Sequence, residues 1–113
     1  MFDPSEHFLS VREFLEKNKG IPPGSFEKYL NLFQLVYHAK TYLLICHQND
    51  LLDKARIHFS IVVIGKIEHY KTESSKIIGF TDKQMNVIKV HLGKLEEWKL
   101  ELTDMNNSNQ NKI

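Results

Sequence analysis

The stretch Phe26–Cys46, with the sequence FEKYLNLFQLVYHAKTYLLIC, decides the fold that we expect for this chain. Its apolar residues recur at helical spacing and reach nearly all the way round the helix that this spacing predicts. Ser25 stands immediately before it, where a serine hydroxyl can cap the first turn. A helix that is apolar on almost every side is buried by several neighbours. The stretch therefore predicts a central helix with other helices packed around it.

The residues before this stretch predict a shorter helix and a connector. Asp3 can cap that helix, Pro4 suits its first position and Glu6 completes a capping box. Apolar residues then fall on one helical face as far as Gly20, where the helix is expected to end. Ile21–Gly24 contains two adjacent prolines, each of which restricts itself and the residue before it. This segment therefore predicts an extended connector.

The residues after the central stretch predict a third helix. His47–Asp50 is expected to break the chain, and Asp50 is expected to cap the helix that follows. Over residues 57–63 the apolar positions also alternate with the period of two that a strand would show. We favour a helix because helix-forming residues flank this run on both sides and no turn signal separates them. Thr72–Ser75 then predicts a polar loop.

The last part of the chain predicts a fourth helix and a tail. Thr81 is expected to cap the helix, and Gln84 closes a capping box before a long apolar stripe. The asparagine-rich end is low in complexity, so we expect one domain over residues 1–103 and a disordered polar tail over residues 104–113. The expected fold is all-α, an antiparallel bundle of about four helices with short loops.

Composition limits the function classes that fit this chain of 113 residues, which suits a single domain. Fifteen basic residues balance fourteen acidic ones, which argues against nucleic-acid binding. The single cysteine, Cys46, allows no internal disulfide and fits a reducing compartment. The start of the chain lacks the basic and apolar regions of a signal peptide, and the longest apolar run, Ile61–Ile64, is far shorter than a membrane span. We therefore expect a cytoplasmic protein.

The residue types that carry chemistry do not form a recognisable site. No two of the six histidines stand four residues apart, the spacing at which one helix presents two ligands to a metal ion. Cys46 and His47 are adjacent, so they point in different directions on a helix and cannot act as nucleophile and base. Glycine-rich phosphate loops are absent from the sequence. We therefore expect no catalytic residue, no metal and no cofactor.

Two local patterns leave alternatives open. His91–Lys94 resembles the phosphoacceptor region of histidine phosphotransfer domains, although its leucine, glycine and lysine stand in a different order. Phe80–Ile88 resembles the opening helix of some helix-turn-helix regulators. The residues that follow continue the helix with an acidic face, which phosphate repels, where a turn and a recognition helix would be needed. Neither alternative outweighs a role in binding proteins.

Several segments together resemble the amino-terminal domain of the AMSH-type deubiquitinases. The same segments are similar to the dimerisation domain of a ubiquitin-specific protease family and, more loosely, to MIT (microtubule-interacting and trafficking) domains. They are Ile21–Pro23 leading into an aromatic-bearing helix, Ala39, Asn49–Leu51, the pair Ala55 and Phe59, and Leu92–Trp98. In these families the alanine corresponding to Ala55 packs closely against a neighbouring helix, and the aromatic residue follows one turn later.

The resemblance implies a non-enzymatic recruitment module. Such domains dock the helical tails of ESCRT-III subunits in a groove between helices, or pair with a second copy of themselves. The implied location is the cytoplasm with endosome association, and membranes are reached only through partners. Lys54, Arg56 and Lys66, around the third helix, are the candidate partner-binding residues. The alternative is a helical regulator such as an immunity protein, a secretion chaperone or an anti-sigma-like inhibitor, which needs the same features.

Overall fold

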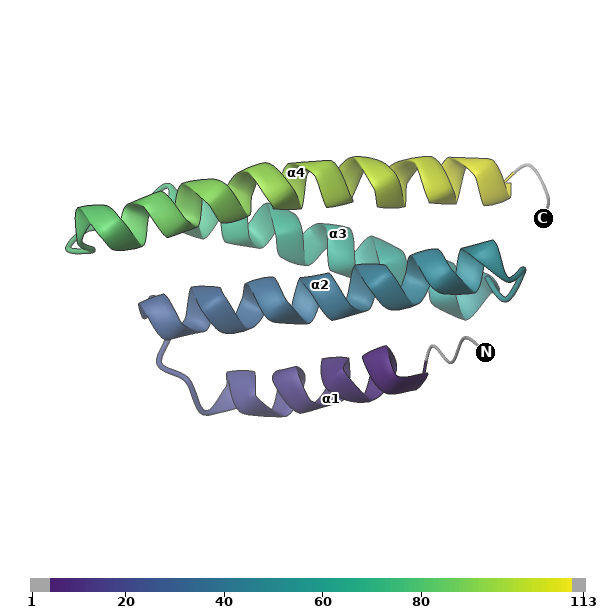
Figure 1. Ribbon diagram of the computed structural model, residues 1–113, viewed down its shortest axis with the longest axis horizontal. Helices are drawn as coiled ribbons and strands as arrows, with labels where there is room; N and C mark the ends of the chain where they lie inside the picture. Colours follow the sequence, from purple (N-terminus) through teal and green to yellow (C-terminus); the bar gives the residue numbers. More distant parts are fainter. Residues whose placement is uncertain (1–4, 111–113) are drawn as a thin grey trace.

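The computed structural model describes residues 5–110, the side chains of residues 109 and 110 excepted, and it forms four α-helices (Figure 1). The helices are α1 (Ser5–Lys19), α2 (Phe26–Gln48), α3 (Lys54–Ser74) and α4 (Asp82–Gln110). Successive helices run antiparallel and are joined by short loops (Figure 1). The predicted all-α bundle is confirmed. The choice of helix over strand for residues 57–63 is also confirmed, because they lie within α3.

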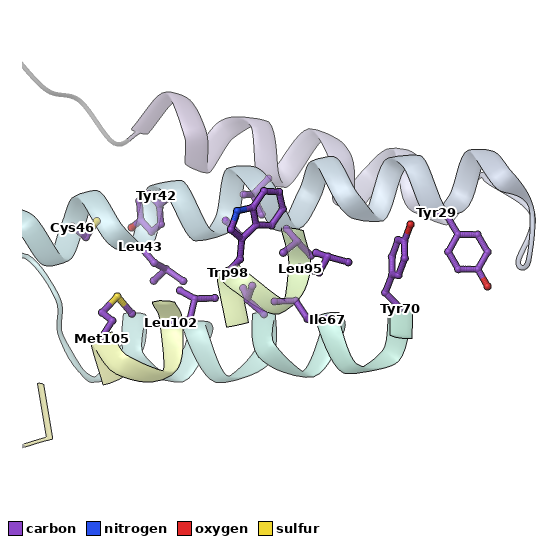
Figure 2. Close-up of a cluster of buried hydrophobic side chains, with 14 of the residues drawn as sticks. Tyr29, Tyr42, Leu43, Cys46, Ile67, Tyr70, Leu95, Trp98, Leu102 and Met105 are labelled. Atoms are coloured by element: carbon purple, nitrogen blue, oxygen red, sulfur yellow. The ribbon is translucent and has the colours of Figure 1, made fainter. Parts of the chain in front are cut away.

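The long helix α2 is central, as its apolar circumference predicts. It packs against each of the other helices, whereas α1 packs against α2 alone within the described part of the chain. The core lies among α2, α3 and α4, where Leu43, Ile67 and Leu102 are at most 1 % exposed. Figure 2 shows these side chains pointing toward one another from the three helices. The molecule is therefore a three-helix core with α1 added on one side of α2.

The predicted helix starts at Ser25 and Thr81 are confirmed. The hydroxyl of Ser25 accepts a hydrogen bond from the backbone N–H of Lys28 at 3.2 Å. Thr81 and Gln84 form the predicted capping box, because each side chain accepts a hydrogen bond from the other residue's backbone N–H. The predicted capping residues Asp3 and Pro4 lie outside the described residues.

The turn between α2 and α3 differs from the prediction. Asp50 does not cap α3. It has a φ of 57° and ends α2, where the N–H groups of Asp50 and Leu51 donate to the carbonyls of His47 and Cys46. This is the Schellman arrangement, which needs a left-handed residue just after the helix. Asp53 is the residue that caps α3, by accepting a hydrogen bond from the N–H of Arg56 at 2.9 Å.

The polar segment Thr72–Ser75 is also not the loop that the sequence predicts. Its first three residues form the last turn of α3. Ser74 is buried, and its hydroxyl donates to the carbonyl of Lys71, while that of Ser75 donates to Thr72. These local hydrogen bonds satisfy the polar side chains inside the helix. The loop consists of residues 75–81.

The helix α4 continues beyond residue 103, where the sequence predicts a disordered tail. Met105 and Asn106 are 3 % and 8 % exposed. The side chain of Asn106 lies 2.7 Å from the hydroxyl of Ser60 on α3, so this polar residue has a buried partner. The tail prediction treated Asn106 as part of a low-complexity run and missed these contacts. Residues 111–113 lie outside the described residues.

Candidate functional site

Two hollows lie between α1 and α3, on the side of α2 that neither helix covers. The larger, of about 600 Å³, is lined by Asn18, Pro23, Gly24, Lys28, Tyr29, Leu32, Val62, Gly65, Lys66, His69, Tyr70 and Glu73. The smaller, of about 360 Å³, is lined by Phe8, Tyr42, Asp53, Ala55, Arg56 and Phe59. We call the residues that line the two hollows the α1–α3 groove.

One stripe of α3 forms a wall of both hollows. Its members recur every three or four residues, which places them along one face of the helix. They are Ala55, Phe59, Val62, Lys66, His69 and Glu73. Phe8 and Asn18 from the two ends of α1 form the opposite wall, and residues of α2 form the floor. The two hollows therefore follow a single line across the surface.

The groove exposes large apolar side chains to solvent. Phe8 and Val62 are 40 % and 42 % exposed, and Phe59 is half-buried. The ring of Tyr42 is buried between them, with its centroid 5.3 Å from that of Phe8 and 6.4 Å from that of Phe59. Because the aromatic rings support one another, the smaller hollow has firm apolar walls. Such a surface can bury an apolar side chain from another molecule.

The three candidate partner-binding residues lie at different places. Lys66 lines the larger hollow and is half-buried, and Arg56 lines the smaller one. Lys54 is exposed at the start of α3 and lines neither hollow. The structure thus places two of the three predicted residues in the groove.

Arg56 is held by contacts within the chain. Its Nε donates to the hydroxyl of Tyr42 at 2.9 Å, and its Nη1 donates at 2.9 Å both to the carbonyl of Leu51 and to Asp53. The hydrogen bond with Tyr42 is the main cause that raises the pKa of Arg56. The guanidinium therefore fixes the start of α3 to α2 and to the loop between them. The sequence does not predict this role, because Tyr42 stands 14 residues away.

The tyrosines of the larger hollow are not suited to acid–base chemistry. Tyr29 and Tyr70 pack edge to face, with their ring centroids 5.1 Å apart. Burial raises the pKa of the Tyr70 phenol, and burial with the nearby Glu73 raises that of Tyr29. Both phenols stay protonated at neutral pH. Their arrangement is that of packed core residues with polar ends.

His91 lies on α4 and packs against α2 and α3. Its ring stacks on Phe33 with the centroids 3.7 Å apart and the planes 4° apart, and its Nδ1 lies 3.1 Å from the hydroxyl of Tyr70. Burial lowers the pKa of His91. A phosphoacceptor histidine has to meet its partner in solvent, whereas one face of this ring and one nitrogen are occupied. One ring face and one nitrogen of His91 therefore contribute to the packing of the bundle, and the half-buried side chain also lines a surface hollow beside Val87 and Val90.

A histidine pair that the sequence does not reveal joins α1 to α2. The Nδ1 atoms of His7 and His38 lie 3.1 Å apart, although the residues are 31 positions apart in the chain. Phe14, also on α1, stacks on His38 with the ring centroids 5.5 Å apart. Burial, and to a lesser extent the charge of His7, lower the pKa of His38. Within the described residues, no group of three or more histidine, cysteine, aspartate or glutamate side chains could hold a metal ion.

Other sequence features take up structural positions. Cys46 is fully buried, beyond the reach of solvent. Residues 82–110 form one uninterrupted helix, without the turn that a helix-turn-helix motif needs. Of the residues that carry the family resemblance, Ala39 is fully buried, whereas Ala55 is exposed. None of the helices, over the part of the chain that the structure covers, is long and apolar enough to cross a membrane.

Comparisons with known proteins give no relative. No protein-family model matches the chain, and no curated protein or solved structure matches it either. The function must therefore be inferred from the groove and its chemistry.

Proposed function

We propose that this chain is a non-enzymatic protein-interaction module that receives a helix of a partner protein in the α1–α3 groove. The observation that carries the proposal is the apolar surface of the smaller hollow, where Phe8 on α1 and Phe59 on α3 flank the buried ring of Tyr42, and which the exposed Val62 continues along the same face of α3. Helix-in-groove recognition uses this arrangement, because the apolar face of an amphipathic helix leaves water when it enters the groove.

The dimensions of the groove suit a helix of several turns. The wall on α3 extends from Ala55 to Glu73, which corresponds to about 27 Å at 1.5 Å per residue. A partner helix of about 18 residues would span that length. Apolar residues three and four positions apart on such a helix would fall at the spacing of Phe59 and Val62.

The resemblance to MIT-like domains gives this proposal a specific form. In that form the chain is a cytoplasmic adaptor that recruits or regulates a deubiquitinase at endosomes by binding the tail helices of ESCRT-III subunits. Titration of fluorescently labelled ESCRT-III tail peptides into the full chain tests it. We expect a dissociation constant in the micromolar range, as is usual for a short helix in an open groove.

A matched pair of variants shows whether the groove is the binding surface. Val62→Glu places a carboxylate on the groove wall, whereas Leu100→Glu makes the same kind of change at an exposed position of α4 outside the groove. We expect Val62→Glu to abolish binding and Leu100→Glu to leave it intact. Equal effects of the two changes would contradict the proposal. If the tails do not bind but another helical peptide does, the groove stands and the ESCRT-III form is wrong.

A further inference from the structure

We infer that the partner helix presents an acidic face to the groove and crosses α3 at Gly65. This inference rests on the proposed function, since it names the chemistry and the position of the helix that the α1–α3 groove would receive. Two independent observations carry it. One is the charge along the edges of the groove, and the other is a helical glycine that the fold itself does not need.

The edges of the groove carry cations without ion-pair partners. Lys66 lies on the wall, Lys54 is exposed at the start of α3 beside Ala55, and the exposed Arg12 stands four residues after Phe8 on the same face of α1. None of these three takes part in any of the ion pairs found within residues 5–108. By contrast, Lys71 on α3 and Lys99 on α4 are paired with Glu96 and Glu68, in ion pairs that join these two helices.

The acidic groups of the groove are already engaged. Asp53 pairs with Arg56 at 2.9 Å, and Glu73 lies 3.9 Å from Lys76. The groove edges therefore present an excess of positive charge, although the chain as a whole is nearly neutral. Complementary charge steers association and fixes the register of a bound helix, so the fitting partner carries carboxylates beside its apolar stripe.

Gly65 lies in the middle of α3 and lines the larger hollow. A glycine in a helix interior costs about 0.5–1 kcal/mol relative to alanine. No neighbour within the chain requires it, because a Cβ atom at this position would meet nothing within 4 Å. The missing side chain leaves a notch beside Val62 and Lys66, where the backbone of another helix can approach closely.

Gly93 supplies a matched comparison within the same molecule. It also lies in the interior of a helix, is exposed, and has open space where a Cβ atom would stand. It lines neither hollow of the groove. Replacing either glycine by leucine should raise helix propensity to a similar extent, so both variants are expected to fold.

The experiment uses two designed helical peptides that share one apolar stripe and differ in their polar face, which is glutamate-rich in one and lysine-rich in the other. Each is titrated against the wild-type chain, Gly65→Leu and Gly93→Leu. We expect the acidic peptide to bind the wild type at least about tenfold more tightly, a preference that added salt reduces. We expect Gly65→Leu to weaken that binding about tenfold or more without lowering the melting temperature, and Gly93→Leu to leave it unchanged.

The outcomes separate the two levels of the proposal. If neither peptide binds the wild type, the proposed function itself fails. If both peptides bind equally, or the basic one binds better, the acidic face is wrong while the groove remains. If Gly65→Leu binds as the wild type does, or Gly93→Leu loses as much affinity, Gly65 is not the crossing point.

Discussion

The contact between α1 and α2 differs in kind from the core that α2 forms with α3 and α4. The core is closed by aliphatic and aromatic side chains, with Leu43, Val63 and Leu102 completely buried. On α1, Val11 is the one described residue that is fully buried, and polar groups make up much of the seam with α2. They include the pair of His7 with His38 and a hydrogen bond from the side chain of Asn31 to the carbonyl of Phe14.

This difference indicates that stability is distributed unevenly. Apolar burial is the dominant favourable contribution to folding, and α1 contributes little of it. Regions with few buried apolar contacts open at a lower free energy than the core does. Since α1 forms one wall of the α1–α3 groove, we expect that wall to open at a lower free energy than the wall on α3.

The largest expected effect comes from a cavity in the core. Leu43→Ala removes a fully buried side chain from the C-terminal half of α2, and we expect the free energy of unfolding to fall by about 2–5 kcal/mol. Denaturation in urea, followed by circular dichroism, measures this loss. Hydrogen exchange should show faster opening of α2, α3 and α4 together.

The matching change on the other side is Val11→Ala. It removes two methyl groups, so we expect a loss of about 1.5 kcal/mol at about 0.8 kcal/mol for each buried carbon. Its effect on hydrogen exchange should be largest in α1. If Val11→Ala accelerates exchange equally in all four helices, α1 belongs to the core and the comparison fails.

A smaller effect is expected from the buried amide in the α1–α2 seam. Asn31 is 4 % exposed, and its Nδ2 donates to the carbonyl of Phe14 at 3.0 Å. Asn31→Ala removes this hydrogen bond between the helices, which should cost about 0.5–1.5 kcal/mol. Because the bond holds α1, the amides of α1 should exchange faster while those of α4 change little. Gln34→Ala, at an exposed position of the same helix, should leave both unchanged.

The contact between Tyr42 and Arg56 tests the link between the two regions, because Tyr42 touches Phe8 on α1 as well as the start of α3. Tyr42→Phe keeps the ring and removes only the hydroxyl that accepts from Arg56. We expect a loss of about 1 kcal/mol in the free energy of unfolding. Tyr37→Phe removes a hydroxyl from an exposed ring and serves as the control. If the two variants lose equal free energy of unfolding, the hydrogen bond from Arg56 to Tyr42 adds nothing to stability.

The features that could be predicted from the sequence are the local ones. Ser25 and Thr81 were identified as caps because a capping interaction joins residues within one turn. The end of α2 shows the limit of this reasoning. Both Asp50 and Asp53 are suitable caps by type, and the choice between them depends on the Schellman turn, which requires a left-handed residue at position 50.

The groove was only partly predictable for a different reason. Lys66 and Arg56 could be named because they stand among the polar positions of α3. No local sequence pattern indicates that α1 and α3 flank the same hollows, because each helix packs on α2 and, within the described residues, the two do not contact each other. The pairing of His7 with His38 depends on the same arrangement of helices, so a search for ligands at helical spacing could not find it.

The smallest expected effect is a dependence of stability on pH that differs between the two regions. Burial lowers the pKa of both His38 and His91 below the ordinary value of 6.5. As the pH falls through 6.5, the unfolded chain therefore takes up protons that the folded chain resists, and the free energy of unfolding decreases until the lowered pKa values are passed. Protonation of His38 also places positive charge next to His7 in the contact between α1 and α2, whereas His91 lies on α4, where it contacts Phe33 on α2 and Tyr70 on α3. Hydrogen exchange at about pH 7.5 and about pH 5.5, corrected for intrinsic rates, should show α1 opening first at the lower pH. His38→Gln should remove most of the pH dependence of exchange in α1, whereas His91→Gln should not. Equal behaviour of the two variants would show that protonation affects the α1–α2 contact and the core to the same extent.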